Sequence, residues 1–379
     1  MESPEASGES TPVAAGEDTP AETGEDTPVA PGENVPLVVF VHIRKTAGYT
    51  MRHILHRQYR RRQIRQIENY FAKPEASVAS TNTLAGEPPP GLRLLHGHFL
   101  LWPDVPWPEG TRFFTLIRDP VERVISQYFW SASKQETRLP KMRSVLAAGR
   151  IPDNLQTRVL AGSDPPFGET TEAMLEQALA NLERFAAVGV TEWFDESLLL
   201  FTHAFEWHPL LYRRANVTEK RKRREEIPSK VLRLIERQNA LDLELHRYAR
   251  QRLKRDLAVL GDEFKVNLEV LKRGNARLAS TQGGAPAGPA IVESATAATD
   301  LRERLIDAKA TLLLHRELRY ERMREEEGET ADSVPSELAD FDDEGRLEER
   351  VAILEAKFRR QNGDAGRSEA QAGLAARES

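Results

Sequence analysis

The sequence predicts an α/β fold in three layers, with a central, mainly parallel sheet flanked by helices and a helical appendage at the C-terminus. Between residues 36 and 261, short β-branched or aromatic runs alternate with helical segments, which is the pattern of a parallel sheet. Two of these runs pass directly into helices through turns that carry basic residues. Beyond residue 261 the strand pattern ends, and charged helical segments follow.

The composition excludes several kinds of site. The 379 residues include no cysteine, which rules out disulfides, thiolate metal sites and thiol nucleophiles together. No apolar run is long enough to cross a bilayer, and the N-terminus is acidic instead of a basic lead into an apolar segment. We therefore expect a soluble, cytoplasmic protein with no membrane span.

Residues 1–36 are expected to form a disordered acidic tail. They repeat a Gly-Glu-x-x-Pro pattern with a period of eight and contain nine Asp or Glu but no Lys or Arg. Such low hydrophobicity and one-signed charge cannot offset the entropy of ordering the chain. The tail therefore carries a charge of −9 and the remainder +3, which together give the formal net charge of −6. That balance suits an anionic ligand but is too small to indicate nucleic-acid binding.

The stretch 38–50 is typical of a strand, an anion-binding loop and the start of a helix. Its first six residues are an apolar, mostly β-branched run, and helical spacing of apolar residues follows from Met51. Gly48 lets backbone approach a ligand closely, and the first amides of a helix carry the positive end of its dipole. Lys45 adds a point charge, so we expect a nucleotide-like anion here. The other candidate binding residues of this loop are Arg44, Thr46, Ala47, Tyr49 and Thr50.

The first helix is predicted to run into the basic stretch 57–65, which would most simply be a solvated helix face. The alternative is an entrance for an anionic acceptor such as a sulfated or uronic-acid glycan. Residues 72–91 contain three consecutive prolines and are predicted to form a loop.

A second strand, 93–99, is predicted to end at a turn in which His96 and His98 flank Gly97. Imidazole titrates near neutral pH, so these two histidines are the best candidates for a general base. The alternative is a pair of structural or surface histidines. A metal site is not indicated, because neither Cys nor a His-x-x-x-His pair supplies further ligands nearby.

A third strand, 112–117, leads into the second basic turn. Asp119 is a good N-cap and Pro120 a good first helical residue, which places Arg118 where the strand ends and the helix begins. Ligands of open α/β sheets bind at that place. Ser126, two turns along, is expected to lie off the apolar stripe and to donate a hydrogen bond. The alternative is that Arg118 only pairs with a carboxylate and that Ser126 faces water.

The remaining pattern predicts further elements. They are a helix over 153–162 closed by Gly162, a helix over 171–182, a strand over 185–190, a helix over 194–205 and a long helix over 228–260 closed by Gly261. The basic run 220–224 is predicted to be a solvated loop. Two later segments, about 298–326 and 344–361, have apolar faces that could pair with each other, with the main domain or with another subunit. The last residues, 362–379, are expected to fray.

Taken together, the two basic turns resemble the sulfotransferases that use 3′-phosphoadenosine 5′-phosphosulfate (PAPS), and most of all the heparan sulfate 2-O-sulfotransferase-like group. Residues 44–50 are similar to the family's 5′-phosphosulfate loop, and Arg118 with Ser126 is similar to its 3′-phosphate site. His96-Gly97-His98 is similar to the segment that supplies the catalytic base. Residues 154–162, 188–192 and 239–242 also resemble these relatives.

The resemblance covers about residues 36–260 and implies a P-loop-like catalytic domain over 37–261, followed by a helical appendage over 262–379. It implies an O-sulfotransferase that uses PAPS, needs no metal and transfers a sulfuryl group to a hydroxyl, expected on a glycan or glycoconjugate. By resemblance His98 is the base, with His96 orienting it or the acceptor, while the residues themselves leave open which histidine acts. Lys45 would stabilise the leaving group. Family members usually have Pro where this chain has Arg44, and a small hydroxyl residue where it has Tyr49.

Two other functions fit some of the same residues. A P-loop phosphotransferase that uses ATP or GTP would need Gly-x-x-x-x-Gly-Lys-Ser/Thr, whereas Lys45 precedes Gly48 here. A non-catalytic, anion-binding adaptor would not need Lys45, His98, Arg118 and Ser126 together. No nucleic-acid partner is expected, and a homo-oligomer could form through the C-terminal helices.

Overall fold

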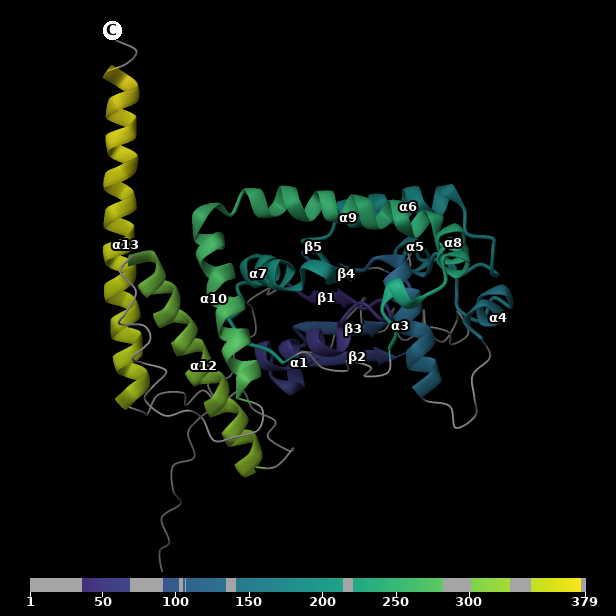
Figure 1. Ribbon diagram of the computed structural model, residues 1–379, viewed down its shortest axis with the longest axis horizontal. Coiled ribbons are helices and arrows are strands. Elements are labelled where there is room, and N and C mark those ends of the chain that lie inside the picture. Colours follow the sequence, from purple (N-terminus) through teal and green to yellow (C-terminus); the bar gives the residue numbers. More distant parts are fainter. Residues whose placement is uncertain are drawn as a thin grey trace, which may run out of the picture. The chain divides into compact units, whose positions relative to one another are not determined.

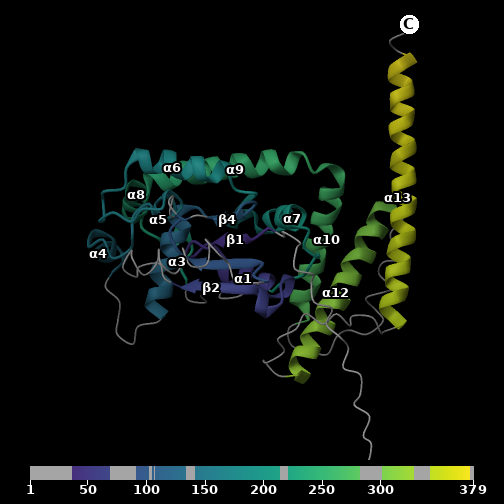
Figure 2. The same ribbon diagram turned by 180° about the vertical axis from the view of Figure 1, so that it is seen from behind.

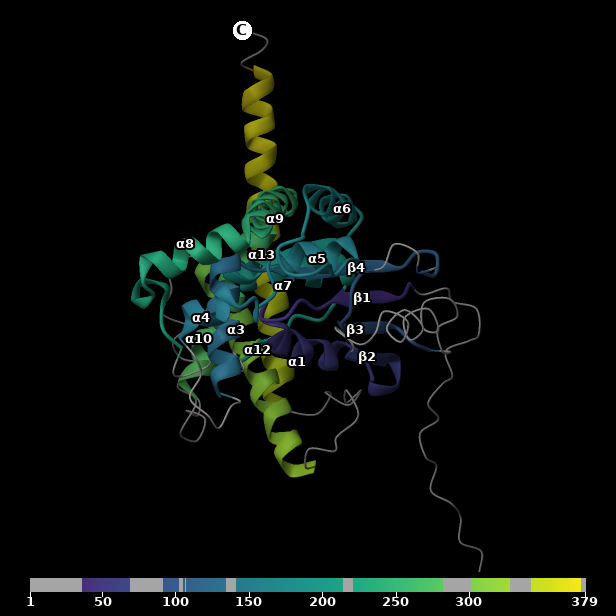
Figure 3. The ribbon, with the colours of Figure 1, turned by 90° about the vertical axis from the view of Figure 1, so that its right-hand side faces the viewer.

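The computed structural model describes residues 36–68, 91–101, 105, 107–133, 141–213, 221–281, 301–327 and 342–375 (Figure 1). Its centre is a sheet of five parallel strands: β1 (Val38–Val41), β2 (Ile64–Glu68), β3 (Leu94–His98), β4 (Arg112–Ile117) and β5 (Ala187–Val190). The strand order is β2-β3-β1-β4-β5, so β1 lies between β3 and β4 (Figure 3). The predicted α/β class with a parallel central sheet is confirmed. Apart from residues 36 and 91, the expected tail and the expected loop over 72–91 lie outside the described residues.

Helices connect and flank these strands. They are α1 (Gly48–Gln58), α3 (Pro120–Ser133), α4 (Met142–Ala147), α5 (Leu155–Ala161), α6 (Glu172–Glu183), α7 (Phe194–Phe205), α8 (Ser229–Gln238), α9 (Ala240–Ala258), α10 (Gly261–Ser280), α12 (Leu301–Glu327) and α13 (Asp342–Ala375). α7 and α9 pack against β5, and α6 lies beside α9, as the opposite views of Figures 1 and 2 show. None of the helices within the described ranges combines the length and the apolarity that crossing a membrane requires.

The central strands form because their residues are apolar on both faces. All four residues of β1 are buried, as expected for a strand covered on both sides of a parallel sheet. The rings of Phe40 on β1 and Phe114 on β4 stack with their centroids 4.7 Å apart. The Thr115 hydroxyl donates a hydrogen bond of 2.7 Å to the Val41 carbonyl, which ties the last residue of β1 to its neighbour β4.

The strand order creates a switch point at the carboxyl ends of β1 and β4. From β1 the chain proceeds to β2 and β3 on one side of the sheet, and from β4 it proceeds to β5 on the other side. Val41 and Thr115 are paired across the two strands, so the segments that follow them start side by side. Ligands of open α/β sheets bind at such a point, because the connections diverge there.

The basic stretch 57–65 is not a continuous helix face, so that prediction is wrong. α1 ends at Gln58, residues 61–63 form a 3-10 turn, and β2 begins at Ile64. β2 pairs with β3 along its whole length, and Ile67 is buried. The sequence pattern gives little indication of β2, because Arg65 and Gln66 interrupt its apolar residues. β2 is a strand because it pairs with β3, which is distant in the sequence.

The long helix predicted over 228–260 is two helices. Asn239 separates α8 from α9, and its side chain forms two hydrogen bonds at the break. Nδ2 donates to the Ile235 carbonyl at 2.9 Å, and Oδ1 accepts from the Asn154 N–H at 3.1 Å. Gly261 follows α9 with a φ of 67°, a left-handed conformation that favours glycine. α10 then starts at Gly261 itself, so the turn joins two helices instead of ending the helical region.

The C-terminal helices pack on each other and on α10. α10 contributes Leu271 and Leu278 to the central core, and its Val266 and Val270 belong to a second apolar cluster with residues of α12 and α13. Thus the apolar faces predicted for the two later segments do pair with each other. The boundary predicted after residue 261 falls at the turn between α9 and α10.

An ion pair joins α12 to α1. Arg57, in the last turn of α1, donates to both carboxylate oxygens of Glu317 on α12 at 2.8 and 2.7 Å, and both side chains are largely buried. The Arg57 guanidinium also lies 4.2 Å from the centroid of the Tyr320 ring. Arg57 is therefore not a solvated residue, and α12 is fixed to the helix that begins at Gly48.

Candidate active site

The two basic turns predicted from the sequence meet at the switch point. The guanidinium of Arg118, which follows β4, donates from Nη1 to the carbonyl of Lys45, which follows β1, at 2.9 Å. Lys45 and Ala47 have φ values of 69° and 65°, which non-glycine residues rarely adopt. Such strained backbone clusters at ligand-binding sites. Inside the turn, the Thr46 hydroxyl donates to the Ile43 carbonyl at 2.9 Å, so this hydroxyl stabilises the loop itself.

The other predicted residues of the loop differ in exposure. Gly48 and Thr50 are buried at the start of α1, and Arg44 is half-buried. Tyr49 is 41% exposed, and its ring lies 4.7 Å from the His53 ring and 4.8 Å from the Arg52 guanidinium. The Tyr49 ring thus contacts side chains one turn further along the surface of α1.

The backbone of Arg118 is held on both sides by one glutamine. Its N–H donates to Gln156 Oε1 at 2.9 Å, and Gln156 Nε2 donates to its carbonyl at 2.8 Å. Asp119 is the N-cap predicted for α3, since its Oδ1 accepts from the Glu122 N–H at 3.0 Å. The Asp119 N–H donates to Glu192 at 3.0 Å. These contacts fix the position of Arg118 independently of any ligand.

A third cation joins Lys45 and Arg118. Arg221 forms a hydrogen-bonded ion pair with Glu122 of α3, so the basic run 220–224 is not simply a solvated loop as predicted. Arg224 of the same run contacts Asp119 at 3.5 Å. We call Lys45, Arg118 and Arg221 the cation cluster. Sequence reasoning missed Arg221, for which the only signal was the length of the basic run.

The cation cluster is poorly compensated by the carboxylates around it. Burial, followed by the charges of Arg118 and Arg221, lowers the pKa of Lys45 to about 8. Burial and Arg221 lower the pKa of Arg118 to about 10, although Glu192 and Glu122 oppose the change and Glu122 lies 3.8 Å away. The Nε atoms of Arg118 and Arg221 are buried without a hydrogen-bond partner among the described residues. A bound anion would relieve both conditions.

α3 carries two residues of interest near this cluster, Trp130 and Ser126. Trp130 is 39% exposed, and the Lys45 ammonium lies 5.2 Å from the centroid of its ring, within the range of a cation–π interaction. Ser126, one turn earlier on α3, is buried, so it does not face water. Residues four apart lie on the same side of a helix, and Ser126 and Trp130 therefore share the side that carries the Lys45 contact.

The two predicted histidines have different environments. His98 Nδ1 lies 2.9 Å from the His42 carbonyl, and because a carbonyl can only accept, Nδ1 carries the hydrogen. In the neutral ring, the basic lone pair is then on Nε2. His96 is buried, and burial, His56, Arg52 and His98 lower its pKa to about 4. His96 is thus neutral and weakly basic at neutral pH, which favours His98 as a base.

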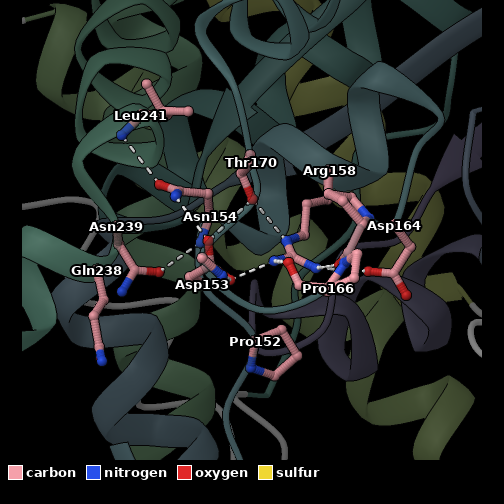
Figure 4. Close-up of polar contacts among 12 residues, drawn as sticks. Pro152, Asp153, Asn154, Arg158, Asp164, Pro166, Thr170, Gln238, Asn239 and Leu241 are labelled. Carbon is pink, nitrogen blue, oxygen red and sulfur yellow. Dashed lines mark hydrogen bonds and ion pairs between the residues drawn. The ribbon is translucent and has the colours of Figure 1, made fainter. Parts of the chain in front are cut away.

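A buried polar network supports the Arg118 turn. The carboxylate of Asp242 on α9 accepts from the Gln156 N–H at 3.1 Å and from the Thr157 N–H and hydroxyl at 2.8 Å each. The Asn154 side chain accepts from the Leu241 N–H at 3.1 Å (Figure 4). The same figure shows Arg158 bonded to Asp153. Three segments that the sequence analysis singled out, residues 154–162, 188–192 and 239–242, are thus brought together around the Arg118 turn. Gln156 contacts Arg118 directly, Asp242 holds Gln156, and Glu192 accepts from the Asp119 N–H.

No family model matches the chain, and no curated protein matches it. Among the described residues, no group of three or more His, Asp or Glu side chains could hold a metal ion. The cation cluster, the histidines and the backbone that positions them are the features of this site that bear on function.

Proposed function

We propose that the protein is a sulfotransferase that moves a sulfuryl group from PAPS to a hydroxyl of a carbohydrate acceptor. The hydrogen bond between Arg118 and the Lys45 carbonyl is the observation that carries this proposal. It joins the loop that resembles a 5′-phosphosulfate site to the turn that resembles a 3′-phosphate site, at the switch point of the sheet. A nucleotide with anionic groups at both its 5′ and 3′ positions suits such a pair of turns.

The residues of the site suit this ligand. Lys45 and the amides at the start of α1 would hold the 5′-phosphosulfate, and Arg118 and Ser126, together with Arg221, would hold the 3′-phosphate. The poorly compensated charge of the cation cluster and the unpartnered Nε atoms of Arg118 and Arg221 supply the physical reason for an anion to bind. Arg118 is already held by Gln156, so little ordering is needed on binding.

The donor, when bound, supplies an activated sulfuryl group. The acceptor hydroxyl forms the new bond to sulfur as the bond from sulfur to the bridging phosphate oxygen breaks, and its proton passes to His98 Nε2. A positioned base of this kind contributes about 10²- to 10⁴-fold. Lys45 stabilises the electron pair left on the departing phosphate, because a cation close to the developing charge attracts it more strongly at a partly buried position than in open water.

The first test compares adenosine 3′,5′-bisphosphate with ADP and with adenosine 5′-monophosphate by calorimetry. Hydrogen bonds to charged groups contribute roughly 1.5–3 kcal/mol, so the 3′-phosphate should tighten binding by about 10- to 100-fold over either control. Equal affinity for ADP would instead favour a phosphotransferase that uses ATP or GTP.

A second measurement separates an enzyme from a non-catalytic adaptor. Purified protein is incubated with PAPS that carries radioactive sulfur and with candidate glycans or small alcohols. We expect label to appear on a carbohydrate hydroxyl. Tight binding of the bisphosphate without transfer to any acceptor would favour the adaptor.

The binding of the bisphosphate should depend on pH through Lys45. The pKa of this lysine is about 8, so the unliganded protein loses the charge as pH rises through that value. A bound anion favours the charged form of Lys45 and raises its pKa in the complex, so binding near pH 8 and above takes up a proton. Kd for the bisphosphate should therefore increase from about pH 7 to about pH 9, by at most about tenfold per pH unit. Calorimetry in two buffers with different ionisation enthalpies measures the proton uptake.

Lys45→Arg is the matched control for this pH dependence. Arginine keeps its charge throughout the interval, so the variant should bind with a Kd that barely changes with pH. The same slope in both proteins would show that a different group titrates.

A further inference from the structure

His42 has no role in the reaction proposed above, yet it contacts the base in two ways. It directly follows β1, and its carbonyl accepts the hydrogen bond from His98 Nδ1 at 2.9 Å. Its ring lies against the His98 ring, with the centroids 4.1 Å apart and the planes inclined by 31°. The His42 ring also stacks with the Phe40 ring, with centroids 5.4 Å apart and planes inclined by only 11°. The core of the sheet thus fixes the ring that contacts His98.

The same ring also lies against the first residue of α1. A Cβ atom added at Gly48 would be 1.6 Å from His42 Nε2 and within 2.2 Å of two ring carbons. Glycine is therefore needed at position 48 because the His42 ring occupies the space that any side chain would fill. The first amides of α1 start at this residue, and they belong to the loop assigned to the donor.

The His42 ring carries no charge at neutral pH. Burial, followed by the charges of His98, His96, Arg52 and Arg44, holds the pKa of His42 well below its ordinary value. These four groups come from β3, α1 and the loop after β1. A neutral ring can stack on His98 without repelling the proton that His98 gains when it acts as a base.

We propose that His42 positions the catalytic base: its ring, which packs against Gly48 and Phe40, keeps His98 at a fixed place beside the start of α1, and its carbonyl selects the tautomer with the lone pair on Nε2. The expected effect of His42 on the reaction rate rests on the proposed function. Its expected effect on the position and tautomer of His98 rests on the contacts alone. His42 acts through His98 and takes no proton itself.

The test uses three variants of the full chain. His42→Ala removes the ring, His42→Phe keeps a flat ring without nitrogens, and His42→Leu fills the space without a flat face. Displacement of a reacting group by about 1 Å costs about 10²-fold, so kcat should fall by about that factor in His42→Ala and His42→Leu. His42→Phe should restore most of it. Kd for adenosine 3′,5′-bisphosphate should change by no more than about threefold in all three variants, because His42 is outside the cation cluster.

Nuclear magnetic resonance of the histidine ring nitrogens supplies a readout that does not need activity. The His98 signals are assigned by their absence from His98→Ala. The parent and His42→Phe should show the single tautomer with hydrogen on Nδ1, whereas His42→Ala should show a mixture because the ring that holds His98 at the carbonyl is gone. If the parent neither binds the bisphosphate nor transfers sulfate, the proposed function fails while this signature still tests the role of His42.

Three outcomes would overturn the inference. The first is an unchanged kcat and an unchanged His98 tautomer in His42→Ala. The second is a loss of bisphosphate affinity that matches the loss of kcat, which would mean that His42 only builds the loop. The third is a His42→Phe variant as impaired as His42→Ala, which would assign the effect to the ring nitrogens. If His42→Ala does not fold, as judged by circular dichroism, His42→Leu takes its place in each comparison.

Discussion

Replacing His98 with alanine is expected to lower kcat for sulfuryl transfer by about 10²- to 10⁴-fold, the usual contribution of a general base. The substitution removes Nε2, which carries the basic lone pair of the neutral ring when Nδ1 donates to the His42 carbonyl. Binding of adenosine 3′,5′-bisphosphate should persist, because the cation cluster that would hold it is formed by other residues. Initial rates at saturating donor, together with calorimetry of the bisphosphate, measure the two effects separately.

His203→Ala is the matched control, since His203 is an exposed histidine on α7. Its rate should equal that of the parent. Full activity in His98→Ala would move the role of the base to another group. His96 is a poor replacement, because a pKa of about 4 makes it a weak base at neutral pH.

Replacing Asp242 with alanine is expected to reduce the free energy of unfolding by about 3 kcal/mol or more, because each buried hydrogen-bond donor left without an acceptor costs about 1–3 kcal/mol. Asp242 is fully buried and accepts three hydrogen bonds from Gln156 and Thr157, so those donors would remain inside without acceptors. A chain of this size should melt about 10 °C lower. Thermal denaturation followed by circular dichroism measures the change.

Glu244→Ala provides the comparison on the same helix. Glu244 is exposed, so its replacement should alter stability by no more than about 0.5 kcal/mol. Because Gln156 brackets Arg118, Asp242→Ala should also weaken bisphosphate binding at temperatures where it is folded. A melting temperature equal to that of Glu244→Ala would show that the network contributes little.

The elements with strong local signals could be predicted from the sequence. The apolar runs of β1 and β4 and the Asp119–Pro120 start of α3 are found where their residues indicated. Gly162 ends α5 with a φ of 72°, and the Thr171 hydroxyl caps α6. In each case, residues adjacent in the sequence determine the structure, so the pattern alone is informative.

What could not be predicted depends on residues distant in the sequence. β2 is a strand because β3 pairs with it, and α8 ends at Asn239 because that side chain accepts a hydrogen bond from Asn154. Arg221 reaches the cation cluster through Glu122, which lies 99 positions earlier. The role proposed for His42 depends on its contacts with His98 and Gly48, which no sequence pattern reveals.

The ion pair between Arg57 and Glu317 has a mechanical consequence for recognition. α1 carries the ligand loop at its first turn and is clamped by α12 at its last turn, so it is restrained at both ends. A helix held at both ends cannot swing toward the nucleotide proposed as ligand. Adjustment to that ligand would fall to single side chains such as Lys45, which would leave the Trp130 ring. For the proposed ligand, the C-terminal helices would thereby make this loop a stiff receptor whose shape is set when the chain folds.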